Sequence, residues 1–87
     1  MKHFVYIIYS ASYDVYYKGE TADIDNRLEA HNADKSTYTR GKGPWLLVYL
    51  EMVSDRTTAL KREKILKRQN RAYIEWLITQ PINILHS

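Results

Sequence analysis

The chain has 87 residues, a formal net charge of +3 and no cysteine, so it suffices for one small domain, and disulfide frameworks and thiolate metal sites are excluded. Its longest wholly apolar run covers six residues, 45–50, against the roughly 20 that cross a bilayer, and its N-terminus lacks a signal-peptide pattern. We therefore expect a single domain over residues 1–87 that is soluble in the cytoplasm and does not enter a membrane.

Positive charge is concentrated in the later part of the chain. Residues 1–34 carry three Lys or Arg against six Asp or Glu, whereas residues 35–87 carry ten against four. An anionic partner is therefore expected to dock on the later part.

Two short β-prone runs open the chain. Residues 3–10 and 15–21 are rich in aromatic and β-branched side chains and flank a polar turn at residues 11–14. This pattern is typical of two strands joined in a hairpin.

A helix is predicted next, with Thr21 or Asp23 as its N-cap. One stripe of this helix carries the apolar Ile24 and Leu28 together with Arg27 and His31, at helical spacing. The two basic side chains need partners there, because an unpaired buried charge is costly. Tyrosine hydroxyls of a neighbouring strand, or a bound anion, would serve.

A long loop and a third strand follow. Residues 32–44 are polar and basic, with Gly and Pro clustered at residues 41–44, which predicts a surface loop. Residues 45–53 are apolar at both alternating positions, as in a strand covered on both faces.

Two helices complete the predicted fold. Ser54 or Asp55 caps a helix that runs to about Arg68, and Asn70 caps a last helix over residues 71–79. The whole pattern predicts an α/β (α+β) fold with a small, three-stranded, mainly antiparallel sheet flanked by about three helices.

Glu63 is an anomaly in the first of these helices. Residues 56–71 carry seven Lys or Arg and this single acid. On a helical wheel, Glu63 falls within the apolar arc defined by Ala59, Leu60 and Leu66, so it should point towards the sheet. From the residues alone, pairing with Arg27 or with tyrosine hydroxyls is favoured over a role as a metal ligand.

The ordered set of Phe-Val-Tyr at residues 4–6, Tyr-Lys-Gly at residues 17–19 and then Arg27 resembles the GIY-YIG nuclease superfamily. Its catalytic domain is named for two short strand motifs, which a helix with an essential Arg follows. The resemblance covers nearly the whole chain and points to the short, single-domain bacterial members. The spacing from Arg27 to His31 is similar to that in the catalytic subunit of the eukaryotic branched-DNA endonuclease.

The resemblance implies a catalytic role for four residues. Tyr17 would help to activate the attacking water, Tyr6 would assist or orient it, Arg27 would bind the scissile phosphate, and Glu63 would hold Mg²⁺ or Mn²⁺. His31, one turn beyond Arg27, is a fifth candidate that would supply charge or shuttle a proton. Read without the resemblance, Arg27 is equally compatible with a surface salt bridge to Asp23 or Glu63, and His31 with a surface or helix-C-terminal histidine, while plain packing is favoured for both tyrosines.

Two positions depart from the family pattern. Glu20 stands where many relatives, including the incision nuclease of bacterial excision repair, place a Lys. Lys18 should project to the opposite side of the strand and so does not replace it. For a late Asn that supports the family's site, Asn83 is the nearest match, but it lies farther from Glu63 than is usual.

Basic residues of the loop and of the helix after the third strand are expected to bind a phosphate backbone, with Tyr38 stacking on an unpaired base. The candidate substrate-binding residues are Lys35, Tyr38, Arg40, Lys42, Lys61, Lys64 and Lys67.

The expected function is that of a divalent-metal-dependent endonuclease that hydrolyses DNA, with branched or damaged DNA as the expected substrate. The alternative is a module of the same fold that binds nucleic acid without cutting it. A third class, a protein-interaction domain, predicts no salt-dependent nucleic-acid binding. At this size, we expect a protein partner or a homodimer to supply specificity.

Overall fold

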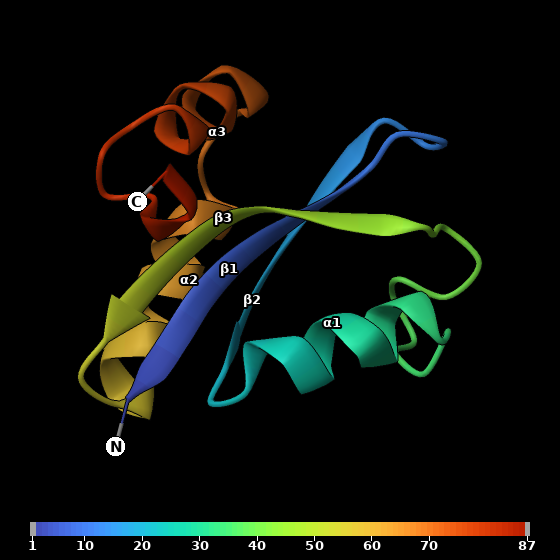
Figure 1. Cartoon of the computed structure of the whole chain (residues 1–87). Helices are drawn as coiled ribbons and strands as arrows, with labels where there is room; N and C mark the ends of the chain where they lie inside the picture. Colours follow the sequence, from blue (N-terminus) through green and yellow to red (C-terminus); the bar gives the residue numbers. More distant parts are fainter. Residues whose placement is uncertain (1, 87) are drawn as a thin grey trace.

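A computed structural model describes residues 2–86 of the chain (Figure 1). Its elements in chain order are β1 His3–Ser10, β2 Val15–Thr21, α1 Ile24–Asn32, β3 Trp45–Val53, α2 Arg56–Lys67, α3 Arg71–Ile78 and the short 3-10 helix η1 Ile84–His86. The predicted strands and helices are all confirmed, and the last main helix ends one residue earlier than expected.

The three strands form one antiparallel sheet in the order β2-β1-β3. Strand β1 is therefore the central strand, and its Tyr6 pairs with Gly19 of β2 and with Leu50 of β3. The expectation that β3 is covered on both faces is confirmed for its central part, because Tyr49 belongs to the cluster on one side of the sheet and Leu50 to the cluster on the other. Strand β3 is nevertheless an edge strand, and its covering is incomplete. Its Leu46 and Met52 are 65% and 48% exposed.

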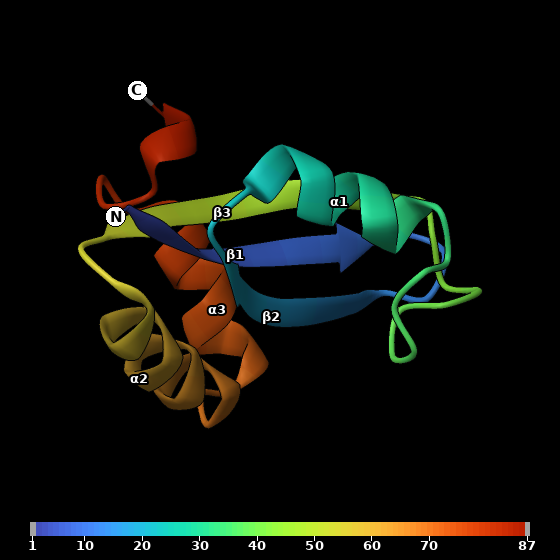
Figure 2. The same cartoon turned by 90° about the horizontal axis from the view of Figure 1, so that it is seen from below.

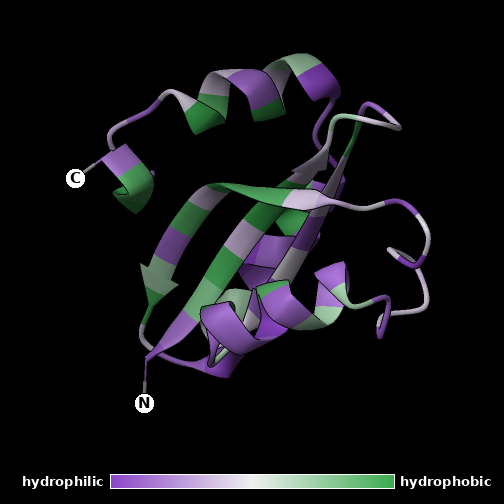
Figure 3. Cartoon of the chain, turned by 45° about the vertical axis from the view of Figure 1, so that its right-hand side comes forward, coloured by the Kyte–Doolittle hydropathy of each residue, from purple (hydrophilic) through white to green (hydrophobic). Residues whose placement is uncertain are grey.

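Helices cover both faces of the sheet, with α1 on one side and α2 and α3 on the other (Figure 2). Because side chains alternate along a strand, β1 supplies a hydrophobic cluster to each side. Val5 and Ile7 pack towards α2 and α3, and Tyr6 and Ile8 pack towards α1. In Figure 3 hydrophobic colour is concentrated on the strands, and helix α1 and the loop after it are mainly hydrophilic.

Each main helix begins at a side-chain cap that satisfies a free backbone N–H group. Asp23, Asp55 and Asn70 accept hydrogen bonds from the amides of Asn26, Thr58 and Tyr73. Of the two alternatives that the sequence left open for each of the first two helices, Asp23 is the cap of α1 and Asp55 is the cap of α2. Within residues 2–86 no helix is long and apolar enough to cross a membrane.

Helix α2 presents a narrower apolar face than expected. Ala59 and Leu66 are completely buried, but Leu60 is 43% exposed. The side chain of Glu63 is only 17% exposed, so it does turn towards the sheet as its place on the helical wheel predicted.

Candidate active site

Tyr6 and Gly19 form the base of the candidate site, on the face of the sheet that α1 covers. The Tyr6 ring is 1% exposed and lies across the Gly19 backbone. A Cβ atom at position 19 would overlap the Tyr6 hydroxyl group. Glycine at this position therefore makes room for the phenol.

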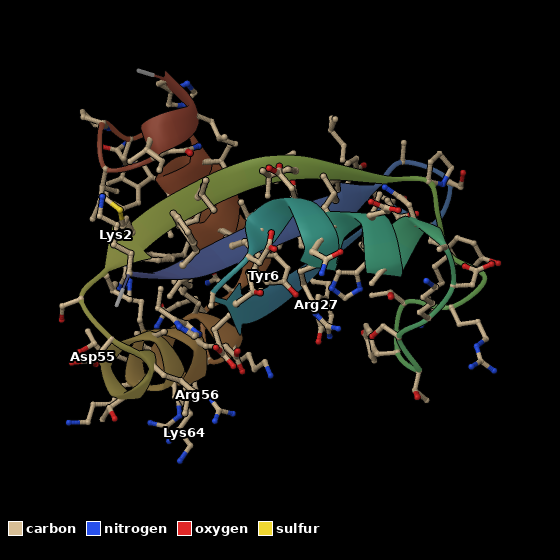
Figure 4. The ribbon with its side chains drawn as sticks, turned by 60° about the horizontal axis from the view of Figure 1, so that its bottom comes forward. Lys2, Tyr6, Arg27, Asp55, Arg56 and Lys64 are labelled. Atoms are coloured by element: carbon tan, nitrogen blue, oxygen red, sulfur yellow. The ribbon has the colours of Figure 1, made fainter. Side chains whose placement is uncertain are left out.

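A row of hydrogen bonds runs from helix α1 through Tyr6 to the loop after α1. Arg27 Nε donates a long hydrogen bond of 3.4 Å to Tyr6 Oη, and Figure 4 shows these two side chains next to each other. Tyr6 Oη lies 2.8 Å from His31 Nε2, and His31 Nδ1 lies 2.7 Å from Thr39 Oγ1. His31 and Thr39 are completely buried.

Both central groups of this row are neutral at pH 7, and burial moves the pKa of each farther from that pH. Desolvation raises the pKa of Tyr6 to about 12, although the neighbouring Arg27 works against the shift. Desolvation, assisted by the charge of Arg27, lowers the pKa of His31 to about 4. Tyr6 is therefore a poor base, and His31 contributes hydrogen bonds here and not charge.

Arg27 supplies the positive charge of the site. Among residues 2–86 it has no carboxylate partner, so the expected alternative of a salt bridge with Asp23 or Glu63 is not formed. Its pKa is raised, first by the hydrogen bond with Tyr6 and also by the nearby Tyr17. A half-buried guanidinium without a carboxylate can bind an anion through its planar donors.

Tyr17 lies in an aromatic group that opens to solvent. Its ring centroid is 5.1 Å from that of His31, in an edge contact, and 5.3 Å from that of Tyr38. Tyr38 is 56% exposed, and Lys42 Nζ lies 4.3 Å from its ring centroid. The exposed Tyr38 and Lys42 thus border the site that Tyr6 and Tyr17 form.

Glu63 approaches the same region from α2, which packs against β2. Its charge is one cause of the raised pKa of Tyr6, so the carboxylate is within electrostatic reach of that phenol. Lys67 Nζ lies 2.8 Å from its Oε1. A ligand that binds this carboxylate must compete with Lys67.

The donor set fits a hard divalent cation held mainly by water and substrate. Residues 2–86 contain no group of three His, Asp or Glu side chains that would form a protein cage for a metal. Mg²⁺ characteristically uses one or two carboxylates together with water and phosphate oxygens. The partly buried carboxylate of Glu63 satisfies that requirement with a single protein ligand.

Glu20 lies on the other face of the sheet from Tyr17, as the alternation along β2 requires. Its carboxylate is 2.5 Å from His3 Nε2 and 3.8 Å from Arg56 Nε. The negative charge at this position is therefore engaged away from the phenols. Lys18 lies on the same face as Glu20, as expected, and burial lowers its pKa.

Asn83, the nearest match to a late supporting Asn, holds backbone groups of β3 and of the end of α3. It is completely buried and accepts from the Leu50 amide at 3.1 Å. It also donates to the carbonyl groups of Val48 and Ile78 at 2.9 and 2.8 Å. Because β3 and β2 are opposite edges of the sheet, Asn83 stabilises the edge distant from Tyr17.

The basic residues divide into paired and exposed sets. Arg62 pairs with Glu51 of β3, and Arg71 pairs with Asp14 of the turn between β1 and β2. A count of the acids within the helix alone could not reveal these pairs. The candidate substrate-binding residues that are exposed are Lys35, Tyr38, Arg40, Lys61, Lys64 and Lys67. Lys42 is partly buried, and Lys67 pairs with Glu63 as described.

Thr39 is the member of the site that sequence reasoning missed. It stands in a polar loop and belongs to no periodic pattern. The loop is fixed because the Asn32 side chain contacts both the amide and the carbonyl of Trp45, and because Trp45 Nε1 donates to the Thr39 carbonyl. Tyr38 thus faces solvent beside Tyr17, and Thr39 faces inward to His31.

Comparisons with known proteins identify the family of this chain. A family model described as the GIY-YIG catalytic domain matches residues 2–76. The chain is 41% identical over 81 residues to a UPF0213 protein of Syntrophus aciditrophicus, and the alignment covers 91% of this chain and 92% of that protein. It is 39% identical over 79 residues to a UPF0213 protein of Aeromonas hydrophila, and that match covers 90% of this chain and 57% of the relative.

A solved structure of similar fold is the solution NMR structure of a UPF0213 protein from Bacillus halodurans. The two chains are 32% identical, with a TM-score of 0.59, and the match covers 94% of this chain and 87% of that one. The expected small α+β fold with a three-stranded antiparallel sheet is confirmed.

Proposed function

Because the chain belongs to the family of GIY-YIG catalytic domains, which is a nuclease superfamily, we propose that it is a divalent-metal-dependent endonuclease that hydrolyses phosphodiester bonds in DNA. The observation that carries this proposal is the place of Arg27, whose guanidinium lies beside two phenols with no carboxylate partner within residues 2–86. Such a charge is suited to a phosphate group.

In the proposed reaction, Arg27 binds the scissile phosphate and neutralises the charge that grows on its oxygens. Tyr17, in its phenolate form, accepts the proton of the attacking water and becomes a neutral phenol while the new phosphorus–oxygen bond forms. The bond from phosphorus to the leaving oxygen then breaks, and that oxygen takes a proton from solvent. Tyr6 remains protonated, since its pKa is about 12, and orients the phosphate or the water by hydrogen bonding.

Glu63 is the proposed ligand of Mg²⁺ or Mn²⁺, which would stabilise negative charge on the leaving oxygen. The pair with Lys67 has a 2.8 Å contact, so this lysine is released when the carboxylate takes another partner. Lys67 then becomes available to a neighbouring phosphate of the substrate.

The remaining candidate residues are proposed to hold the flanking nucleic acid on two sides of the tyrosine site. Lys61 and Lys64 present exposed charges on α2, and Lys35 and Arg40 present exposed charges on the loop. Exposed lysines and arginines bind phosphates with little regard to sequence. Tyr38 would stack on a base that is not paired.

The experiment that tests this function compares wild type with Arg27→Ala and Glu63→Gln. Each is incubated with linear, nicked, flapped and branched DNA, with Mg²⁺, with Mn²⁺ and with neither, and binding is measured in parallel. Wild type should cut at least one form in a metal-dependent way, and neither variant should cut. Failure of wild type to cut any form in either metal would contradict the proposal.

The contact between Glu63 and Lys67 favours a second candidate, a module that binds nucleic acid without cutting it. A carboxylate held by a lysine is less available to a metal ion. This candidate predicts salt-dependent binding of wild type to DNA with no cleavage in any metal. No salt-dependent binding at all would instead indicate a protein-interaction domain.

A further inference from the structure

Thr39, His31 and Tyr6 form a row of three hydrogen-bonding groups in the interior. The Thr39 hydroxyl lies 2.7 Å from one nitrogen of His31, and the Tyr6 hydroxyl lies 2.8 Å from the other. The three residues are between 0% and 1% exposed. Each hydrogen in this row must therefore find its acceptor within the protein or on a bound ligand.

A neutral imidazole carries one hydrogen, so the row has two self-consistent directions. In one direction, Tyr6 donates to His31 Nε2, and His31 Nδ1 donates to Thr39. In the other direction, Thr39 donates to His31 Nδ1, and His31 Nε2 donates to Tyr6. The two directions differ in which hydroxyl hydrogen is left at the end of the row.

The surroundings of the two ends favour the second direction. In the first direction, the hydroxyl hydrogen of Thr39 is left in a fully buried place, and no other side-chain partner of Thr39 Oγ1 exists within residues 2–86. A buried donor without an acceptor is costly. In the second direction, the remaining hydrogen belongs to Tyr6. Arg27 donates to this hydroxyl and cannot accept from it, so the acceptor is water or an anion held beside the partly exposed Arg27.

The second direction also uses the full capacity of the Tyr6 oxygen. Its two lone pairs accept from Arg27 Nε and from His31 Nε2, and its one hydrogen remains for a third partner. Hydrogen bonds in such a row polarise one another, so donation from Thr39 strengthens the donor at Tyr6.

We propose that Thr39 is a positioning residue that holds His31 in the tautomer with hydrogen on Nε2, so that the Tyr6 hydroxyl donates to a phosphoryl oxygen bound by Arg27. The identity of that oxygen rests on the proposed function. The direction of the hydrogen bonds in the free protein is independent of the proposed function.

The direct test is nitrogen NMR of the protein labelled with ¹⁵N in its histidines, at pH 7.5, without DNA or metal. The shifts of the two ring nitrogens report which one carries the hydrogen. Wild-type His31 should carry it on Nε2. Hydrogen on Nδ1 in wild type would overturn the proposal, whether or not the protein cuts DNA.

Substitutions at Thr39 extend the test to function. Thr39→Val keeps the shape and removes the hydroxyl, so His31 Nδ1 loses its hydrogen bond and its nitrogen shift should change. The cleavage rate should fall roughly 10-fold or more, the scale for groups that orient a catalytic ligand. Thr39→Ser should restore both. Thr37→Val, the same change at an exposed position of the loop, should alter neither.

These outcomes separate the proposal from the proposed function. If wild type cuts no DNA, the tautomer in wild type and in Thr39→Ser still decides the direction of the row. If Thr39→Val does not fold, the wild-type spectrum and Thr39→Ser carry the test. A Thr39→Val protein that is folded, with an unchanged Nδ1 shift and unchanged cleavage, would remove Thr39 from the site.

Discussion

The backbone of Gly19 lies so close to Tyr6 that a Cβ atom at position 19 would overlap the Tyr6 hydroxyl. The two residues are also direct partners in the ladder between β2 and β1. The glycine of the second strand motif therefore fixes where the tyrosine of the first motif lies. This relationship explains physically why the two motifs act as one unit.

Gly19→Ala should displace the Tyr6 ring and break its hydrogen bond with His31. Overpacking of this kind costs typically about 1–3 kcal/mol of the free energy of unfolding, and the site should lose cleavage as well. Denaturant unfolding and a cleavage assay measure the two effects. Gly43→Ala is the matched control, because a Cβ atom there meets its nearest neighbours at 3.6 Å, an ordinary contact. Equal stability of the two variants would contradict the geometry.

Glu63→Gln should abolish cleavage and leave DNA binding equal or slightly tighter, since one negative charge near phosphate disappears and Lys67 is released. The loss of this i,i+4 pair should lower the free energy of unfolding by only about 0.5 kcal/mol. Glu75→Gln removes a similar i,i+4 pair with Arg71 on α3 and should leave cleavage unchanged. A Glu63→Gln protein that cuts at the wild-type rate shows that Glu63 is not the metal ligand, and one that does not fold shows that its role is structural.

Tyr17→Phe should fold normally, because the ring and its contacts with His31 and Tyr38 remain. Its cleavage rate should fall by ~10² or more, the scale of lost general-base assistance. Wild-type cleavage should rise from neutral towards alkaline pH, and the remaining activity of the variant should lose this rise. A folded variant with the wild-type rate and pH profile removes Tyr17 from the mechanism.

His31 should make the protein less stable in acid. Its pKa in the folded state is lowered from 6.5 to about 4, so between these values the unfolded chain binds a proton that the folded chain does not. This contribution is therefore complete above pH 6.5 and is lost as the pH falls to about 4, by roughly 3 kcal/mol. Urea unfolding of wild type and His31→Gln across this range measures it as a difference.

The difference in unfolding free energy between wild type and His31→Gln should shrink as the pH falls. A constant difference from pH 7 to pH 4 would mean that His31 takes up its proton equally in both states.

The exposed lysines of α2 should determine the salt dependence of DNA binding. The logarithm of the affinity should fall with log[salt] by roughly 0.9 per neutralised phosphate. A triple change of Lys61, Lys64 and Lys67 to Ala should flatten this slope with little effect on sequence preference. Lys2 lies outside the basic loop after α1 and outside α2, so Lys2→Ala should leave the slope unchanged. An unaltered slope in the triple variant would place the binding surface elsewhere.

The local elements of this protein follow from its sequence alone. Alternation of apolar residues predicts the strands, and the side chains of Asp55 and Asn70 predict where helices begin, because these signals act between residues one to four apart. The same reasoning singled out Tyr6, Tyr17, Arg27 and Glu63 by motif and spacing. Roles in catalysis for these residues stay predictions.

The tertiary structure alone decided which side chains meet. The contact of Thr39 with His31 spans eight residues, and that of Asn83 with the Leu50 amide spans 33. No periodic pattern encodes either contact, since each depends on where a loop or a chain end packs against the sheet. The central place of β1 was decided in the same way, because residues 3–10 and 45–53 are both apolar at alternating positions, and neither pattern alone says which strand is central.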